Sequence, residues 1–232
     1  MSQEPKNRLL NFWRNYLRPF LFIVIILTAF RSSVADWNDV PSGSMKPSIL
    51  EGDRIFVNKL AYDLKIPFTT VHLARWSDPK RGEVVIFYSP KDGTRLVKRV
   101  VGVPGDAIEL REDELFVNGV KAEYQPLDSS VVKQVPLQEQ ANRFFAIEQT
   151  AEAKHPVMIS PNVPAMRSFG PVKLTAGQYF VMGDNRDFSF DSRYFGPVDR
   201  RLIVGRALSV IASLDVNHYF VPRWSRFFKP LP

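Results

Sequence analysis

The stretch RLVKRVVGVPGD, residues 95–106, reads as a β-strand that ends in a turn marked by glycine and proline. Side chains on a strand point to alternate faces, so Leu96 and Lys98 share one face and Arg99 lies on the other. Each face therefore carries one cation between apolar residues, and one of the two cations is expected in a largely apolar setting. Desolvation would lower the pKa of such a lysine toward the range of a general base. Taken alone, the pattern also fits a lysine whose stem packs and whose amine reaches water.

Similar runs on both sides of this strand predict a mainly β protein. The predicted strands cover residues 53–58, 83–88, 95–101, 178–182 and 205–211, with a hairpin over 114–122 that has Asn118-Gly119 at its tip. Residues from about 125 to 177 are more polar and poorly periodic, which is typical of a smaller inserted domain. We expect an antiparallel β-sheet core with an inserted smaller β-rich subdomain, preceded by one N-terminal transmembrane helix. The expected divisions are a basic N-terminus (1–16), an anchor (17–36), the core (37–106 and 178–215), the insertion (107–177) and a basic aromatic tail (216–232).

The N-terminal segment predicts the membrane anchor. Residues 19–30 are rich in apolar and aromatic side chains, but this run makes only about 18 Å of helix against roughly 30 Å of hydrocarbon. A span over residues 17–35 is nearly long enough if Arg18 and Arg31 reach the two interfaces. Positive charge before the run places the N-terminus in the cytoplasm and the rest of the chain across the membrane. The residues Ser33-Val34-Ala35 also fit the end of a cleaved signal peptide, and this alternative stays open.

Composition restricts the chemistry. The chain has 232 residues, 45% of them hydrophobic, which is typical of a folded protein. It contains no cysteine, so disulfides, thiolate zinc sites and cysteine nucleophiles are excluded. A net charge of +7 without any recognisable nucleic-acid reader motif favours attraction to anionic lipid over nucleic-acid binding. The segment 223–229 mixes cations and aromatic residues, as interfacial segments do, although a chain end that packs two phenylalanines into a groove fits equally well.

A second segment carries possible chemistry: PSGSMKPSI, residues 41–49. Gly43 removes a side chain where a substrate backbone would approach. Ser44 is a possible nucleophile if a base lies within about 3 Å. The hydroxyl of Ser42 and the backbone N–H of Ser44 would then face a developing oxyanion. By itself, however, a turn of serine, glycine and proline is usually only a turn.

Other polar residues point to structure rather than chemistry. His72, His155 and His218 have no metal-like spacing and are interpreted as structural or surface residues. Several acidic residues, with Arg186 and Arg193 as available partners, are interpreted as ion pairs that shape a loop and not as a metal site. These acidic residues are Glu51, Asp53, Asp184, Asp187 and Asp191.

Four blocks occur in a fixed order: residues 41–49, 78–85, 96–106 and 183–196. Together they resemble the bacterial type I signal peptidases (leader peptidases). The resemblance implies a membrane-bound serine endopeptidase that removes N-terminal signal peptides from exported preproteins after Ala-x-Ala-type sites. It implies a Ser/Lys dyad and no metal or other cofactor.

The resemblance also implies roles for individual residues. Ser44 would be the nucleophile and Lys98 the general base, with Ser42 and the Ser44 N–H as the oxyanion hole. Ser189 would orient the amine of Lys98, and Asp191 and Arg193 would form a salt bridge that braces the loop. The residues expected to line shallow substrate pockets are Val40, Pro41, Met45, Ile49, Leu96 and Val97.

The expected partners are signal-peptide-bearing preproteins and membrane lipid, with no nucleic acid and a monomeric protein. The expected location is the bacterial inner membrane, with a single pass and the catalytic domain on the extracytoplasmic side. Two alternatives remain: a maturation peptidase of a conjugative pilus system in the same superfamily, and a non-catalytic membrane-tethered β-domain. A self-cleaving repressor of the Ser/Lys type is disfavoured because no glycine precedes Gly43 to form its cleavage site.

Overall fold

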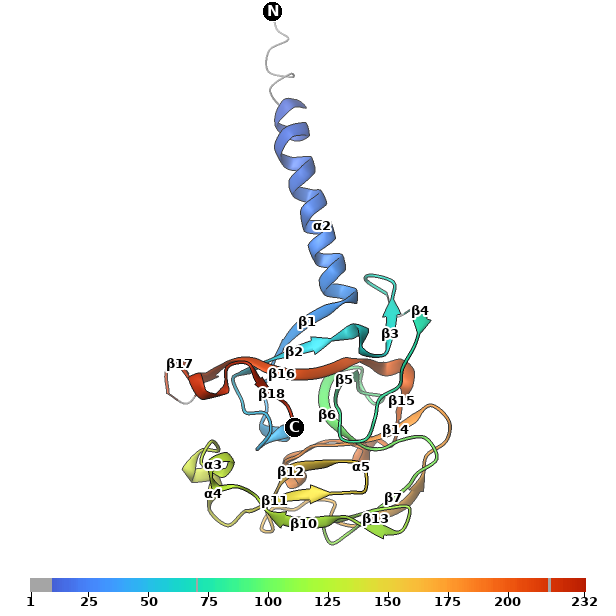
Figure 1. Ribbon diagram of the computed structural model, residues 1–232, viewed down its shortest axis with the longest axis vertical. Coiled ribbons are helices and arrows are strands. Elements are labelled where there is room, and N and C mark those ends of the chain that lie inside the picture. The colour runs from blue at the N-terminus through green and yellow to red at the C-terminus, as the bar shows by residue number, and fades with distance from the viewer. Residues whose placement is uncertain (1–9, 70, 217) are drawn as a thin grey trace, which may run out of the picture.

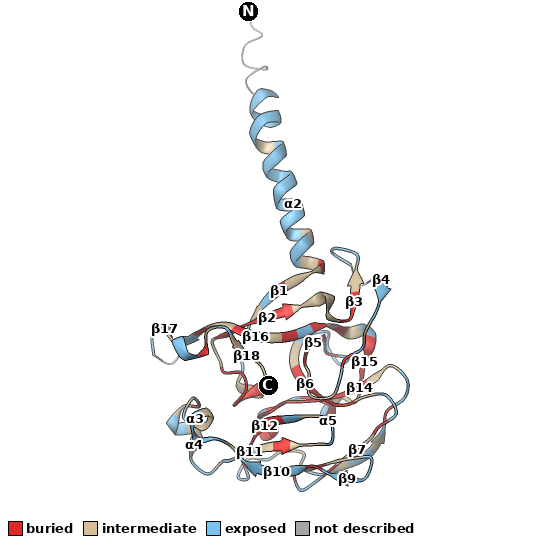
Figure 2. Cartoon of the chain, viewed as in Figure 1, coloured by how far each residue is buried: buried red, intermediate tan, exposed pale blue. Residues whose placement is uncertain are grey.

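A long apolar helix projects from a β-sheet domain (Figure 1). The computed structural model describes residues 10–69, 71–216 and 218–232. The helix runs over Leu10–Ser33, with a π-helical turn at Trp13–Leu17 followed by α2, Arg18–Ser33. Within the described residues it is the one helix long and apolar enough to cross a membrane. Its 24 residues make about 36 Å of helix, enough for roughly 30 Å of hydrocarbon, and nearly all of it is exposed (Figure 2).

The helix ends earlier than the predicted boundary at residue 36. Ala35, expected in the anchor, already belongs to β1, Ala35–Asp39. This strand pairs along its whole length with β2, Asp53–Asn58, from Ala35 opposite Asn58 to Asp39 opposite Arg54. Strand pairing therefore determines where the helix stops. The basic residues before Leu10 lie outside the described residues.

The main sheet is antiparallel and is built from both ends of the chain. Its strand order is β1-β2-β16-β5-β6-β14-β15, with β17 and β18 also paired to β16. The longest strand, β16, lies between β2 and β5. The other bounds are β5 Val84–Tyr88, β6 Arg95–Gly102, β14 Gln178–Met182, β15 Val198–Asp199, β16 Ile203–Asp215, β17 Val221–Pro222 and β18 Lys229–Pro230. The predicted strands 53–58 and 178–182 are confirmed to the residue, and β16 is longer than the predicted 205–211.

The residues between β6 and β14 form two further sheets, of strand order β10-β11-β12 and β13-β7-β8-β9. The hairpin between β8 and β9 turns at Asn118 and Gly119, both at positive φ, which confirms the predicted tip. Several strands arise where the sequence shows little periodicity. The bounds are β7 Ala107–Arg111, β8 Glu114–Val117, β9 Val120–Lys121, β10 Glu123–Pro126, α3 Ser129–Val132, α4 Leu137–Gln140, β11 Phe144–Gln149, β12 Lys154–Ile159 and β13 Phe169–Lys173.

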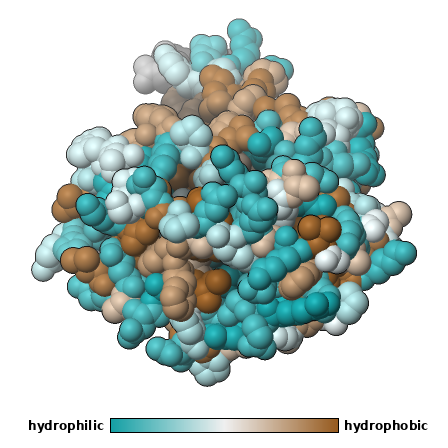
Figure 3. All heavy atoms as spheres, turned by 60° about the horizontal axis from the view of Figure 1, so that its bottom comes forward, coloured by the Kyte–Doolittle hydropathy of each residue, from teal (hydrophilic) through white to brown (hydrophobic). Residues whose placement is uncertain are grey.

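A small hairpin that the sequence did not predict lies beside the end of α2 (Figure 1). It consists of β3, Asp63–Lys65, and β4, His72–Arg75. In its loop, the Phe68 N–H donates to the Ser32 hydroxyl at 2.8 Å. The view with the bottom of the domain turned forward shows a largely hydrophilic surface with scattered apolar side chains (Figure 3).

The C-terminal segment is part of the fold rather than a separate tail. Its strands β17 and β18 pair with β16, and the buried Arg226 binds Asp53 Oδ2 at 2.6 Å. Phe227 is half-buried, whereas Trp224 and Phe228 are exposed. The aromatic residues of this segment therefore do not share one groove, and its backbone completes the main sheet.

The core beneath the serine motif consists of side chains from that motif and from β2, β5 and β16. It fixes the turn of residues 41–49 on the sheet. Its buried members are Val40, Met45, Ile49, Ile55, Val57, Val84, Ile86, Ala207 and Val210.

Candidate active site

Ser44 lies in a 3-10 turn, Gly43–Met45, between an extended Ser42 and the buried Met45. The turn is held from the other end of the sequence by Asn185. The Asn185 backbone N–H donates to the Ser44 carbonyl at 3.1 Å, and its side-chain amide donates to the Gly43 carbonyl at 3.0 Å. The orientation of Ser44 therefore depends on the loop that follows β14.

The amine of Lys98 reaches Ser44 from β6. Lys98 Nζ donates to Ser44 Oγ at 2.7 Å, and the lysine is only 3% exposed. In the described part of the chain, Lys98 forms no ion pair. Burial lowers its pKa to about 8, with Arg193 adding to the effect and the charges of Asp191 and Asp184 opposing it. A substantial fraction of this amine is therefore neutral near pH 8, as a proton acceptor requires.

The next residue, Arg99, is also buried, which the sequence analysis did not predict. Its guanidinium makes a two-pronged ion pair with Asp184, at 2.8 Å from Nε and 2.7 Å from Nη2. Lys98 and Arg99 are therefore both inside the protein, on opposite faces of β6. A carboxylate compensates Arg99, whereas among the described residues the hydrogen-bond partner of the Lys98 amine is the serine hydroxyl.

A glycine allows the loop after β14 to approach the serine turn. A side chain at Gly183 would place a carbon 2.3 Å from Ser189 Oγ and 2.5 Å from the Ser44 carbonyl oxygen. The Ser189 hydroxyl is buried beside this contact, yet it forms no hydrogen bond within the described residues. The expected hydrogen bond from Ser189 to the Lys98 amine is therefore not formed in this structure.

Asp191 and Arg193 pair within the same loop. Arg193 Nε lies 2.8 Å from Asp191 Oδ1, and both side chains are fully buried. Asp191 Oδ2 also accepts from the Gly183 N–H at 3.0 Å, and Arg193 donates to the carbonyl of Arg186. Buried charges persist when such partners satisfy them, and this pair joins the two ends of the loop.

The Ser42 side chain lies on the open side of Ser44. The two hydroxyl oxygens are 3.5 Å apart, and Ser42 makes no capping bond to the 3-10 turn. Its hydroxyl is therefore available to a group that approaches Ser44 from solvent. At Gly43, space for a substrate backbone was expected to require a glycine, but the structure shows a different close contact. A side-chain carbon at this position would lie 2.8 Å from Glu51 Oε1 and 2.9 Å from Lys46 Cε. The glycine thus makes room for the Lys46–Glu51 ion pair.

Ser44 and Lys98 line a groove of about 360 Å³. Five of the six expected pocket residues line it as well: Val40, Pro41, Met45, Leu96 and Val97. The sixth, Ile49, is fully buried in the core beneath the groove. Further lining residues, not predicted from the sequence, are Trp37, Asn38, Asp39 and Arg95. Strand β14 pairs with β6 only from Arg99 to Gly102, so the edge of residues 95–98 that faces away from β5 has no partner strand among the described residues.

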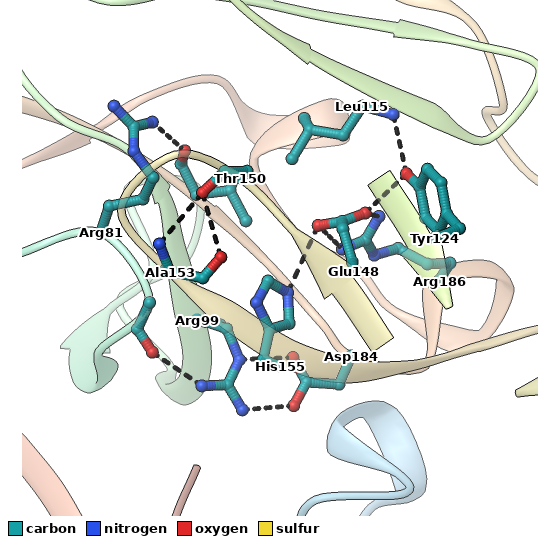
Figure 4. A network of polar contacts seen from close by, with 12 residues as sticks. Arg81, Arg99, Leu115, Tyr124, Glu148, Thr150, Ala153, His155, Asp184 and Arg186 are labelled. Atoms are coloured by element: carbon teal, nitrogen blue, oxygen red, sulfur yellow. Dashed lines mark hydrogen bonds and ion pairs between the residues drawn. The ribbon is translucent and has the colours of Figure 1, made fainter. Parts of the chain in front are cut away.

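A buried polar network connects the inserted strands to the loop after β14 (Figure 4). Arg186 binds Glu148 of β11 at 2.6 and 2.7 Å, and Tyr124 donates to the same carboxylate at 2.7 Å. His155 Nε2 lies 3.3 Å from Glu148. Arg186, for which a partner among the loop aspartates was expected, instead pairs with this glutamate. The sequence offered no signal for it, because Glu148 lies in the poorly periodic insertion.

Of the residues singled out in the sequence, the remaining acidic ones pair with cations, and His72 and His218 each lie beside a carboxylate. Asp187 pairs with Arg167 at 3.1 Å, and Glu51 pairs with Lys46 at 2.9 Å. His72 lies 3.0 Å from Asp63 and the exposed His218 lies 3.0 Å from Asp215. In the described part of the chain, no group of three or more histidine and acidic side chains is placed to hold a metal ion.

Comparisons with known proteins relate this chain to one family. The family described as signal peptidase, peptidase S26, matches residues 13–212. Signal peptidase I of Pseudomonas fluorescens is 36% identical over 214 residues, which are 84% of this chain and 70% of the relative. Signal peptidase I P of Bacillus subtilis subsp. natto is 31% identical over 202 residues, 87% of this chain and 90% of the relative. A solved signal peptidase I from Enterococcus faecalis is 32% identical, with 56% of this chain and 97% of that chain covered and a TM-score of 0.34.

These matches define the class of this protein as serine endopeptidase, a kind of hydrolase. Its fold is mainly β, with one apolar N-terminal helix. More particularly, the chain belongs to the signal peptidase family, peptidase S26. The family resemblance and the fold class inferred from the sequence are thereby confirmed.

Proposed function

We propose that this protein is a membrane-bound type I signal peptidase that cuts exported preproteins after Ala-x-Ala-type sites, with Ser44 as nucleophile and Lys98 as general base. One observation carries the proposal: the buried Lys98 amine, without a carboxylate partner in the described structure, donates to Ser44 Oγ at 2.7 Å. Membership of a signal peptidase family supplies the substrate class.

The mechanism that follows is acyl transfer. In its neutral form, Lys98 takes the proton of Ser44 as the serine oxygen attacks the scissile carbonyl. The Ser44 N–H and the Ser42 hydroxyl stabilise the charge that develops on the carbonyl oxygen. Lys98 then gives its proton to the leaving amine, and it activates the water that hydrolyses the acyl-enzyme. The buried, unpaired hydroxyl of Ser189 fits a role in orienting the amine once substrate is bound.

The groove fits an extended peptide with small side chains. The free edge of residues 95–98 offers main-chain hydrogen bonds to an added strand. Apolar walls from Val40, Met45 and Leu96 exclude large side chains and polar ones that would lose their hydration. The groove runs from Ser44 back toward Trp37, close to the end of α2, so the residues before the cut would lie in it and the apolar part of the signal peptide would remain in the bilayer.

The same arrangement supports a location in the bacterial inner membrane. We propose that α2 makes a single pass, with the N-terminus in the cytoplasm and the catalytic domain on the extracytoplasmic side. Arg14 and Arg18 at the start of the helix support this orientation. We expect a monomer with membrane lipid around its helix. Protease added to spheroplasts should digest the domain, and protection of the domain would reverse the proposed orientation.

The first test is cleavage. Detergent-solubilised wild type, Ser44→Ala and Lys98→Ala are incubated with a preprotein that carries an Ala-x-Ala site, and the products are mapped by mass. Cleavage after the second alanine by wild type and its loss in both variants is expected. The exposed residues Ser225 and Lys133 provide matched alanine controls that should cut normally. A folded wild type that cuts nothing would reject the proposal, and activity that survives Lys98→Ala would reject the lysine as base.

A further inference from the structure

The groove continues past its apolar walls to a cluster of charges at the junction with α2. One buried carboxylate, Asp36, is the partner of three cations from three different parts of the chain. Arg31 Nε of α2 lies 2.8 Å from it, Lys59 Nζ lies 3.2 Å from it, and Arg95 Nη1 of β6 lies 3.4 Å from it. Of these three cations, Arg95 lines the groove. We call these four residues the junction cluster.

The junction cluster carries more positive than negative charge. It has three cations and one carboxylate, and the nearby groove residue Asp39 is already paired with Arg54 at 2.6 Å. Lys59 also donates to the carbonyls of Arg31 and Ser32 at 2.9 and 3.1 Å. These carbonyls lie at the C-terminal end of α2, where the helix dipole supplies only a partial negative charge. The junction therefore keeps an excess of about two positive charges.

Two of the cations are partly exposed, Arg95 in the groove and Arg31 beside the groove residue Trp37. The Arg95 side chain is 32% exposed and the Arg31 side chain 53% exposed. The Arg31 guanidinium is held 4.5 Å from the centre of the Trp37 ring, which itself lines the groove. Stacking of this kind fixes the direction of a guanidinium and leaves its N–H groups free to bind an anion.

The position of this charge relative to the cut follows from strand geometry and rests on the proposed function. A peptide paired with residues 95–98 advances about 3.3 Å per residue, as β6 does. Arg95 lies three residues before Lys98, so it faces the peptide about 10 Å upstream of the scissile bond. With the reach of an arginine side chain, the residues concerned are the fourth to sixth before the cut.

We propose that Arg95, supported by Arg31 and Lys59, forms a subsite that favours an acidic side chain four to six residues before the cleaved bond and disfavours lysine or arginine there. A carboxylate in the groove would share the excess positive charge of the junction cluster. A lysine or arginine of the substrate would be repelled by the same excess positive charge. Asp36 would not compensate it, because this carboxylate already pairs with three cations. Because the subsite is partly open to water, its effect is modest and depends on salt.

The test compares substrates within each enzyme. Preproteins that differ only in Glu, Gln or Lys at each of these three positions in turn are cleaved by full-length wild type and by Arg95→Gln. Wild type should prefer Glu over Lys by about fivefold in kcat/KM at one or more of these positions, and less in about 1 M salt. Arg95→Gln should lose most of this preference for Glu over Lys, and Arg95→Lys should retain most of it. Arg111→Gln removes an exposed cation from β7 in the inserted sheets and should leave the ratio as in wild type.

The outcomes separate the two proposals. Equal cleavage of the Glu, Gln and Lys substrates by wild type, or a preference that survives Arg95→Gln, would overturn the subsite while the proposed function stands. Failure of wild type to cut any of the substrates would reject the proposed function, and the subsite with it. A thermal melt of Arg95→Gln that matches wild type would show that a lost ratio reflects the groove and not unfolding.

Discussion

Lys98 and Arg99 show how two adjacent buried cations are stabilised in opposite ways. Arginine stays charged at any ordinary pH, so its burial requires a carboxylate, and Asp184 supplies one. Lysine can instead release its proton, and a buried lysine without an ion-pair partner does so at lower pH. The hydrogen bond to Ser44 places this amine where the proposed reaction requires an acceptor for the serine proton.

This difference predicts a pH dependence of the reaction. Because the neutral amine is the proposed base and burial lowers the pKa of Lys98 to about 8, kcat/KM should rise with pH and reach half its maximum near pH 8. A pH–rate profile with a neutral Ala-x-Ala substrate measures it. A profile that stays flat between about pH 7 and 9 would contradict the assignment of Lys98 as the titrating base.

The same burial predicts an effect on stability. Burial of a lysine whose pKa is lower in the folded state does not reduce the free energy of unfolding above the unfolded-state pKa of about 10.5. The free energy of unfolding falls as pH decreases from there to about 8, and below that the loss is constant. Lys98→Met should therefore raise the free energy of unfolding by about 2 kcal/mol at pH 7, after the lost hydrogen bond is counted. The gain should vanish near pH 11. Urea denaturation at both pH values measures it, with the exposed Lys133→Met expected to change little.

Between elements, the critical contact joins the serine turn to the loop after β14. Asn185 holds the turn by two hydrogen bonds, and Gly183 lets the loop come close enough to form them. The pair of Asp191 with Arg193 and the pair of Arg99 with Asp184 then fix the loop relative to β6. The position of Ser44 relative to Lys98 thus depends on a segment of chain about 140 residues away from the serine.

Gly183→Ala tests this contact. The added methyl group would overlap Ser189 Oγ and the Ser44 carbonyl, so the turn and the loop must separate. Since a shift of about 1 Å in a catalytic group can cost about 100-fold, we expect kcat to fall by that order. Gly177→Ala is the control: no atom lies within 4 Å of the added carbon, although Gly177, unlike Gly183, lies at positive φ. The Gly177→Ala variant should lose about 1 kcal/mol of stability and keep its activity. Equal activity of Gly183→Ala and Gly177→Ala would show that the close contact at Gly183 does not position Ser44.

In the whole molecule, the N-terminal helix and the domain share few contacts. Most of the helix is exposed, and its links to the domain are concentrated at its end, where Arg31 binds Asp36 and Ser32 binds the loop between β3 and β4. The groove starts beside this junction, so in the proposed function the helix determines where the site lies relative to a bilayer, and it contributes little to the fold of the domain.

Truncation tests this division. A chain of residues 31–232 keeps the junction contacts, so its free energy of unfolding should lie within about 1 kcal/mol of the full chain, while alkaline extraction should release it from membranes. A chain of residues 40–232 also lacks β1 and Asp36 and should be strongly destabilised. Urea denaturation in detergent measures the free energy of unfolding of both truncated chains. Unfolding of the 31–232 chain would show that the helix is a structural element of the domain.

Residues whose behaviour is local could be predicted from the sequence. Alternating or apolar runs predicted β2, β6 and β14, and Asn118-Gly119 predicted a hairpin, because periodicity and turn chemistry depend on neighbouring residues. The helix end was placed too late because pairing of β1 with β2 determines it. The order of the four blocks identified the family, and the two blocks with Ser44 and Lys98 do meet.

The sequence by itself thus determined five strands of the main sheet (β2, β5, β6, β14 and β16), the apolar helix and the family. The tertiary structure alone decided which charges meet: Arg99 with Asp184, Arg186 with Glu148, and three cations around Asp36. It also decided that Ile49 lies beneath the groove. Alternation along a strand shows which face a side chain takes, but not which strand or loop covers that face. A buried charge selects its partner from whatever the fold brings within hydrogen-bond distance, and those groups come from distant parts of the chain.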